Sequence, residues 1–329
     1  MHNITHHISL GTPPQSYKLK YILSVDVKKG GQFLSDRALV RVPAQHRNTW
    51  QEIERIATIG KPIHIAFGYD GENTRELSGF IREVRQEKDS VVLDCEDGMS
   101  LFRRGVPSRV FPSDTRLRDI LSYLITALGI PFDLEVSEDA QDIVYDRFVI
   151  RERTAFEVLK QLKAETQMLF YIRNKTLYVQ GRYQQDSAVR AKRAFYDFSR
   201  NVEKSHLRYV SEADRKIQVT WQSIDLNSQP LEETVGHAGG ERIVRQGYPF
   251  TQVQSLRRVA QEELKKWSYT GYEGYLSGWL QPYCTYGYLV QLKDENYSPR
   301  EGTYFVDKVC LSLGPQGGRR DIYLSQRTD

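Results

Sequence analysis

Three neighbouring carboxylates are the side chains best suited to acid–base chemistry. Asp94 and Glu96 alternate along a strand-like run, and Asp97 follows directly. Two carboxylates at a suitable separation can act as acid and base in the cleavage of a glycosidic bond. Side chains two residues apart on a strand share one face, however, and polar pairs of this kind usually point into solvent. We therefore expect a solvated rim here and assign no catalytic residue.

Other patterns that could bind a ligand each lack a necessary part. The run Gly60-Lys61-Pro62 has Pro where a phosphate-binding loop needs Ser or Thr, and the earlier glycine is missing, so a helix C-cap is the better interpretation. His2, His6 and His7 have a spacing that can bind zinc, but a chain terminus rarely forms an ordered site. The sequence thus predicts neither a cofactor nor a metal.

Basic residues gather in two runs. They are Arg103, Arg104, Arg109, Arg116 and Arg118 in the first run and Arg190, Lys192 and Arg193 in the second. The whole chain carries 46 basic and 42 acidic residues and a net charge of +4, which is too balanced to indicate nucleic acid or an anionic membrane as partner. We interpret both runs as solvated faces, with a polyanion contact as the less favoured alternative.

The chain has neither the signature of a membrane protein nor that of a disulfide-bonded protein. No apolar run approaches the ~20 residues that span a bilayer, and residues 1–10 lack the pattern of a signal peptide. Cys95, Cys284 and Cys310 are odd in number and far apart, which favours a reducing compartment and buried, apolar roles. The 20 tyrosines suit strands and large contact surfaces.

Alternating apolar residues predict strands over the first third of the chain. The runs are Ile22–Val27, Ala38–Val42, Ile63–Phe67, Leu77–Val84 and Val91–Asp94. A capping box at Thr49-Trp-Gln-Glu52 begins a short helix with an apolar stripe at Trp50, Ile53, Ile56 and Ala57. The strands predict a half-open or closed antiparallel barrel, and closure is favoured because it removes exposed edges.

A helical insert follows between Asp114 and Gly181. Apolar spacing predicts a helix over Leu117–Leu128 that ends at Gly129, and a second helix after the capping box Thr154–Glu157. A strand is predicted at Ile143–Ile150, and a hairpin turns at Asn174-Lys175 between Met168–Arg173 and Thr176–Gln180. Because the helices must bury their stripes on the hairpin, the insert should be a compact α+β unit.

The last part of the chain returns to strands. Gly181–Lys216 is polar and predicts a linker, and Ile217–Trp221 predicts a strand. Pro230–Gly247 contains three glycines before the final one and predicts a mobile loop, and Val253–Trp267 predicts a helix. The closing strands are expected at Gly278–Leu280, Tyr288–Leu292, Tyr304–Leu313 and Asp321–Leu324.

These patterns predict a mainly β fold with an α+β insert. We expect two β-barrel domains of the tube type, at residues 1–110 and 183–329, which flank a small helix and hairpin domain at residues 111–182. The two β-rich parts share a layout of strands, one helix and a closing pair of strands. A duplication is therefore a hypothesis, although no residue-level repeat supports it.

Three stretches together resemble the phage late control D and baseplate hub family, which includes the hub portion of type VI secretion spike proteins. The first is Leu77–Val84 leading into Val91–Leu101. The second comprises Leu117–Leu128, Thr154–Leu162 and Leu177–Val179. The third comprises Val253–Trp267, Gly274–Leu280, Gly302–Val309 and Asp321–Leu324. The resemblance covers nearly the whole chain through loose patterns rather than through catalytic motifs.

The resemblance implies a non-enzymatic structural subunit of a virion tail baseplate, assembled in the host cytoplasm. Members form homotrimeric rings whose pseudo-sixfold surface meets the tail tube protein, while the opposite side receives a spike protein; a tape-measure protein is a further candidate partner. The end of the chain at Asp329 suggests a hub whose spike is a separate polypeptide. Two alternatives stay open, a tail-associated cell-wall hydrolase and a carbohydrate- or surface-binding β module with tyrosines as stacking platforms.

Overall fold

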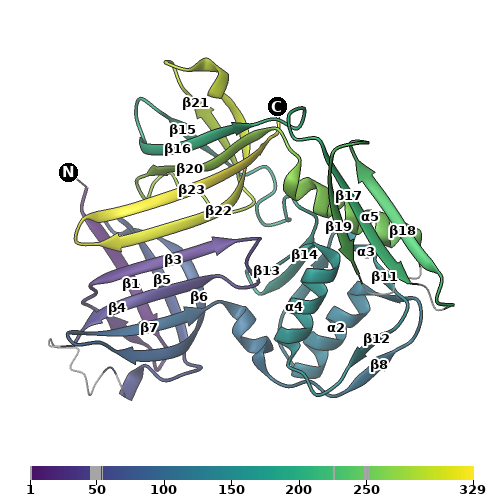
Figure 1. Cartoon of the computed structure of the whole chain (residues 1–329). Helices are drawn as coiled ribbons and strands as arrows, with labels where there is room; N and C mark the ends of the chain where they lie inside the picture. The colour runs from purple at the N-terminus through teal and green to yellow at the C-terminus, as the bar shows by residue number, and fades with distance from the viewer. Residues whose placement is uncertain (1, 45–52, 54, 225–226, 248–249, 251) are drawn as a thin grey trace.

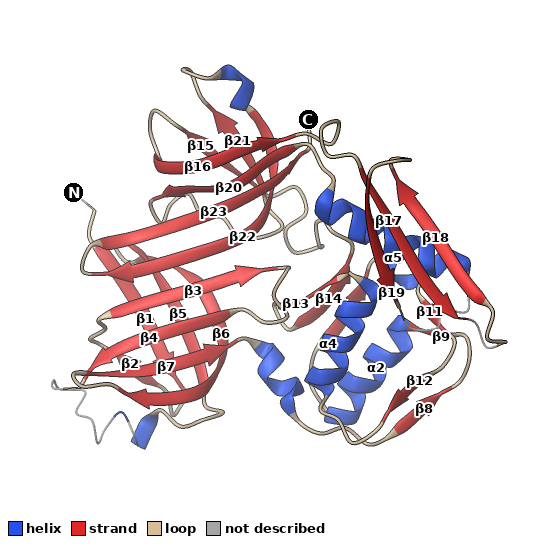
Figure 2. Cartoon of the chain, viewed as in Figure 1, coloured by secondary structure: helices blue, strands red, loops and turns tan. Residues whose placement is uncertain are grey.

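The computed structural model describes residues 2–44, 53, 55–224, 227–247, 250 and 252–329. Strands fill one side of the molecule and the long helices lie on the other (Figure 1 and Figure 2). Strand pairing and core packing divide the described chain into three parts. We name them the first β half, the second β half and the α+β lobe.

The first β half is built from consecutive strands. They are β1 (Ile4–Leu10), β2 (Tyr17–Leu19), β3 (Ser24–Gly30), β4 (Arg37–Pro43), β5 (Pro62–Tyr69), β6 (Glu72–Gln86) and β7 (Ser90–Glu96). Burial alternates along them with the two-residue period of a sheet with one face in the core, as at Ala38, Val40 and Val42 of β4. Asp70 and Gly71 form the predicted turn between β5 and β6, and both have positive φ angles.

The second β half uses strands that are far apart in the sequence. They are β15 (Arg193–Asp197), β16 (Val202–Val210), β20 (Gly271–Gly278), β21 (Leu289–Lys293), β22 (Gly302–Gly314) and β23 (Gly317–Arg327), with a short 3-10 helix η2 (Ser298–Arg300). The prediction of a linker over Gly181–Lys216 is wrong for β15 and β16. As an edge strand, β16 is exposed along most of its length, so its sequence carries little apolar alternation.

One continuous sheet joins the two β halves (Figure 1). Residues Lys308–Leu313 of β22 pair with residues Val25–Gly30 of β3, and the ladder then runs outward on each side to β16 and β2. Among the described strands, no pairing joins β2 to β3 or β15 to β16, so each half is open at one seam. The closed form that the sequence analysis favoured is therefore wrong for the described strands, and the half-open form is observed. A single apolar core runs through both halves.

The α+β lobe contains the long helices and several short strands. Its elements are η1 (Gly98–Arg103), β8 (Arg109–Phe111), β9 (Thr115–Arg116), α2 (Leu117–Leu128), β10 (Asp133–Val136), α3 (Glu138–Gln141), β11 (Val144–Tyr145), β12 (Phe148–Ile150), α4 (Ala155–Thr166), β13 (Leu169–Arg173), β14 (Thr176–Gln180), β17 (Ile217–Ile224), β18 (Pro230–Gly236), β19 (Glu241–Gln246) and α5 (Val253–Trp267). The mainly β fold with a helical insert is thereby confirmed.

The capping signals place the insert helices as predicted. Thr154 and Glu157 form a reciprocal capping box at the start of α4, and Gly129 ends α2 in the left-handed conformation with φ of 58°. Asn174 and Lys175 both have positive φ, as a tight hairpin turn requires. The predicted strand Ile143–Ile150 is instead two short strands, β11 and β12, which pair with different partners.

The segment Ile217–Trp267 belongs to the lobe, which corrects two predictions. Pro230–Gly247 is not a mobile loop, because β18 and β19 within it pair with the two edges of β17. Helix α5 is not the counterpart of a helix in the first β half. Its apolar side, with Leu256, Val259 and Ala260, packs into the same core as α2 and α4.

The predicted helix near residues 49–57 and the predicted domain boundaries are not decided by the described structure. The capping box at residues 49–52 lies outside the described residues, but Ile53, Ile56 and Ala57 of its stripe are buried in the core of the first β half. The domain boundaries at 110/111 and 182/183 stay predictions. The packing adds that residues 217–267 share a core with the insert, so the lobe draws on two separate stretches of chain.

Candidate functional site: buried charges where the three parts meet

A network of three buried charges joins the two β halves. Glu76 of β6 accepts a hydrogen bond from Lys29 of β3 at 2.7 Å and another from Arg320 of β23 at 2.6 Å. The side chain of Glu76 is fully buried, and that of Arg320 is 1% exposed. Because a buried charge is costly unless it is paired, the three groups must stay together.

The electrostatics of the network agree with full ionisation. Burial alone would raise the pKa of Glu76, but Lys29 and Arg320 outweigh it, so that pKa lies below its usual range. Burial alone would lower the pKa of Lys29, but Glu76 reverses the effect and the pKa is raised. Arg320 also donates to the carbonyl oxygens of Leu280 at 3.2 Å and Cys284 at 2.6 Å. The network therefore fixes β3, β6, β23 and the 280–284 loop together.

A lysine attaches the lobe to the first β half. Nζ of Lys163, on α4, donates to the carbonyl oxygens of Gly31 at 2.7 Å and Phe33 at 3.4 Å, in the turn after β3. Lys163 is partly exposed as a residue, but its ammonium group is enclosed at this contact. Burial, assisted by the nearby charge of Arg182, lowers the pKa of Lys163 to about 7.

Two arginines attach the lobe to the second β half. Arg182, just after β14, pairs with Asp307 of β22 at 3.1 Å. Arg173 of β13 binds Asp186 at 2.5 Å and donates to the carbonyl oxygen of Tyr286 at 2.8 Å. The three parts are thus connected pairwise by charged, largely buried contacts. Such contacts can set the relative orientation of rigid parts.

The carboxylates singled out from the sequence do not form an acid–base pair. Glu96 is completely buried and binds Arg103 through two hydrogen bonds of 2.7 and 2.8 Å, so the expected solvated rim is wrong at this residue. Burial alone would raise the pKa of Glu96, but the bonds from Arg103 outweigh it and lower the pKa. Asp94 is half-buried on the same face of β7. Arg103 also stacks 3.9 Å from the ring centroid of Phe156.

A second carboxyl pair lies beside Glu96 and joins Asp97 to Asp36, which the sequence analysis did not consider; Asp97 is buried, so the expected solvated rim is wrong for this residue too. The backbone N–H of Asp36 donates to Oδ2 of Asp97 at 3.1 Å, and Asp97 also accepts from the N–H of Met99 at 3.0 Å. Burial raises the pKa of Asp36 to about 6. Burial and the neighbouring Asp36 raise the pKa of Asp97 well above its usual value. Both carboxyl groups cap local backbone and are almost closed to solvent.

The N-terminal histidines and the Gly60-Lys61 turn make local contacts within the chain. His2 contacts Asp70 at 2.6 Å, whereas His6 and His7 lie within the β1–β5 ladder. In the described part of the chain, no three metal-ligating side chains are grouped to hold an ion. Gly60 adopts a positive φ in a turn, and Lys61 lies over the ring of Tyr17.

The burial of the cysteines and the exposure of the second basic run agree with the interpretations made from the sequence. Cys95 and Cys284 are buried and Cys310 is half-buried, all as free thiols. Arg190, Lys192 and Arg193 are exposed, as predicted for a solvated face. Within the described residues, no helix combines the length and the apolar character needed to cross a bilayer.

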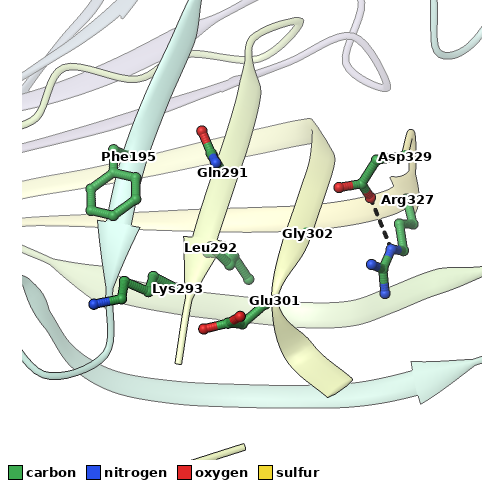
Figure 3. Close-up of a pocket in the computed structure, with 8 residues that line it drawn as sticks. All are labelled: Phe195, Gln291, Leu292, Lys293, Glu301, Gly302, Arg327 and Asp329. Carbon is green, nitrogen blue, oxygen red and sulfur yellow. Dashed lines mark hydrogen bonds and ion pairs between the residues drawn. The ribbon is translucent and has the colours of Figure 1, made fainter. Parts of the chain in front are cut away.

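A surface recess of about 440 Å³ lies beside β15, β21 and the C-terminal end of the chain (Figure 3). Its charged groups bind one another or their neighbours. Arg327 donates to Asp329 at 2.9 Å, Lys293 to Glu295 at 2.6 Å, and Glu301 accepts from the backbone of Asp294 at 3.1 Å. The two lining carboxylates, Glu301 and Asp329, each accept hydrogen bonds from backbone N–H groups of this chain, those of Asp294 and Thr303.

The arrangement of all three parts is shared with solved tail proteins. A tail protein from Neisseria meningitidis superposes with a TM-score of 0.69 at 13% identity, covering 98% of this chain and 97% of that one. The 43 kDa tail protein of prophage MuSo2 from Shewanella oneidensis gives 0.66 at 14% identity, covering 98% of both chains. The c3393 protein of Escherichia coli, a component of the type VI secretion system, gives 0.60 at 10% identity, covering 100% of this chain and 77% of that one.

These similarities establish the fold of the whole chain. At 10–14% identity they do not by themselves establish what the chain does. No family model and no curated protein sequence matches the chain. The fold predicted through the resemblance is therefore confirmed, and the assignment to a function is a proposal.

Proposed function

We propose that the chain is a structural baseplate hub protein of a phage tail or related contractile injection system. In this role it forms a homotrimeric, pseudo-sixfold ring that joins the tail tube to the spike. One observation carries the proposal: tail proteins share the fold over 98% of the chain, including both β halves and the lobe between them. A smaller shared domain would not carry a role for the complete chain.

The architecture suits such a ring. Each subunit contributes two β halves, so three subunits present six β units to a tube of sixfold symmetry. The pairing of β3 with β22 holds the two halves in one sheet, and the Lys29–Glu76–Arg320 network fixes their orientation. A ring also covers open strand edges, such as that of β16, which would otherwise favour aggregation.

The proposal assigns no catalysis to the chain. Glu96, half of the best acid–base candidate, is buried against Arg103 and has no access to a substrate. The rival interpretation as a cell-wall hydrolase predicts a cleared zone when the purified protein is run on a gel that contains peptidoglycan. We expect no clearing. Clearing that persists after removal of contaminating enzymes would replace the structural proposal with an enzymatic one.

The expected partners are the tail tube protein on one side and a spike protein on the other, in the baseplate of the virion tail. A chain of a Francisella PdpA–VgrG complex superposes with a TM-score of 0.58 at 13% identity, covering 99% of this chain and 53% of that one, which supports a spike protein as partner. We also propose assembly in the host cytoplasm. Contact with a tape-measure protein is a secondary expectation.

Mass measurement by light scattering tests the proposal. A trimer of 38.2 kDa subunits has a mass of about 115 kDa when it is measured alone, and any tube or spike protein of the same gene cluster that binds after mixing adds its own mass. A ring with threefold symmetry by electron microscopy would support the proposal. A monomer under all of these conditions would overturn it, whereas a monomer that closes into a trimer only with its spike agrees with it.

A further inference from the structure

The outer edge of the α+β lobe carries a basic ribbon that the proposed hub role does not use. We define the arginine ribbon as β8 and β12 together with the flanking residues Arg147 and Arg151. The two strands pair antiparallel, with Val110 opposite Val149. They lie on the side of the lobe that faces away from both β halves (Figure 1).

The inner face of the arginine ribbon is firmly packed. Phe111, Phe148 and Ile150 are at most 3% exposed and belong to the core of the lobe. The ring of Phe111 contacts those of Tyr123 and Phe148 edge-on, and Tyr123 donates to the carbonyl oxygen of Pro107 at 2.7 Å. The ribbon is thus a rigid platform, and a partner that binds it loses little entropy in ordering it.

The outer face combines positive charge with apolar surface. Side chains alternate along a strand, so Arg147, Val149 and Arg151 follow one another on the outward side. Val110 is 58% exposed and Val149 is 42% exposed, and they are cross-strand neighbours. Arg109 is exposed as well, but it shares the face of Phe111, and its guanidinium group lies over the rings of Phe111 and Tyr123 rather than beside the valine pair.

The exposed arginines of this region form no ion pair with a carboxylate in the described part of the chain, whereas many arginines elsewhere do. Elsewhere Arg182, Arg208 and Arg320 each bind a carboxylate. Within the described residues, no ion pair involves the exposed arginines of this region, which are Arg109, Arg116, Arg118, Arg147 and Arg151. Two carboxylates, Asp114 and Glu152, interrupt the basic segments 103–118 and 147–153. The region therefore attracts negative charge that the chain itself does not supply.

The strands also offer hydrogen bonds. Within the described ladders, β8 pairs only with β12 and β12 only with β8, so each strand has one edge without a partner. An extended chain can add to such an edge through its backbone, while its side chains select for charge. The exposed Val110–Val149 pair favours a protein partner over nucleic acid, because a sugar–phosphate backbone has no apolar side chain to cover it.

We propose that the arginine ribbon is a docking surface for an acidic, extended protein segment that adds a strand to β8 or β12. The arginines bind its carboxylates, and the valine pair packs against its apolar side chains. The inference concerns a partner at the outside of the lobe and does not depend on the trimer, the tube or the spike. The second basic run provides a matched control, because Arg190 and Lys192 are exposed and lie just before β15, outside the paired strand.

A labelled peptide of alternating Glu and Val, measured by fluorescence anisotropy with the full chain, tests the proposal. The variant Arg147→Glu/Arg151→Glu should bind about tenfold more weakly or worse, and binding should weaken strongly between about 0.05 and 0.5 M NaCl. The variant Val110→Ser/Val149→Ser should also lose affinity. The control Arg190→Glu/Lys192→Glu has the same change in charge and should bind normally. Unchanged thermal unfolding of the ribbon variant Arg147→Glu/Arg151→Glu and of this control excludes misfolding as the cause.

Three results would overturn the proposal. One is no detectable binding of the peptide at low salt. Another is an equal loss in the ribbon variant and the control, which would show general attraction to a basic chain. The third is tighter binding of oligothymidylate than of the peptide, with the same dependence on Arg147 and Arg151, which would assign the surface to nucleic acid.

Discussion

Replacing Arg320 should destabilise the chain more than an average substitution, because it breaks a buried network. In Arg320→Met, Glu76 keeps only Lys29 as a charged partner, and the carbonyl oxygens of Leu280 and Cys284 lose their donor. Removing one member of a buried ion pair costs ~3–5 kcal/mol. Unfolding 329 residues carries an entropy of about 0.7 kcal/mol/K, so Tm should fall by ~4–7 °C.

Thermal and urea unfolding, followed by circular dichroism, measure this loss. The variant Glu76→Gln should be similarly unstable, since it leaves two buried cations without an anion. In the double variant the two losses should overlap, with a coupling energy of ~1–3 kcal/mol. As a control, Arg200→Met removes an exposed arginine that lies 3.6 Å from Asp197, and it should change stability by less than about 1 kcal/mol. If Arg320→Met matches this control, the network does not stabilise the junction.

Three further predictions follow from buried groups, all measured by urea unfolding. Leu121→Ala and Leu159→Ala should each cost ~2–5 kcal/mol, since both side chains are fully buried in the lobe, and values near zero would show that the helices are misassigned. The pKa of Asp36 is raised to about 6, so its burial lowers stability as pH rises from about 4 to 6. Asp36→Asn should reduce that slope and add up to ~3 kcal/mol above pH 6, while the buried Asp97, whose pKa is also raised, accounts for the slope that is left. The pKa of Lys163 is lowered to about 7, so stability should rise with pH between about 7 and 10, and Lys163→Met should flatten this rise.

Local signals in the sequence located the elements that depend on local chemistry. The capping box at Thr154, the left-handed Gly129 and the hairpin at Asn174-Lys175 each act within a few residues, so the pattern and the structure agree. The prediction of a loop over Pro230–Gly247 was wrong because the order of this segment does not come from local signals. Its strands are exposed and owe their order to pairing with β17, a long-range effect that glycine content hides.

Two members of the buried network that joins the β halves, Lys29 and Arg320, could have been predicted from the alternation of buried residues along their strands. Val25, Val27 and Lys29 occupy one face of β3, and Arg320 continues the face of Ile322 and Leu324 on β23. A charged residue at a core-facing position of an alternating strand predicts a buried partner. Which partner it has could not be predicted, because Glu76 and Arg320 are 244 residues apart and meet only through the pairing of β3 with β22.

The placement of these charges bears on why a structural subunit would contain them. Apolar residues of similar size could fill the same space at no loss of stability, so the charges are poorly explained as a source of stability alone. Apolar contacts tolerate sliding, whereas Glu76 must meet Lys29 and Arg320 together, and Lys163 must reach the carbonyl oxygen of Gly31. Each contact is satisfied in one relative orientation of the parts that it joins. A subunit that must match two β halves to a symmetric partner needs that single orientation more than it needs additional stability.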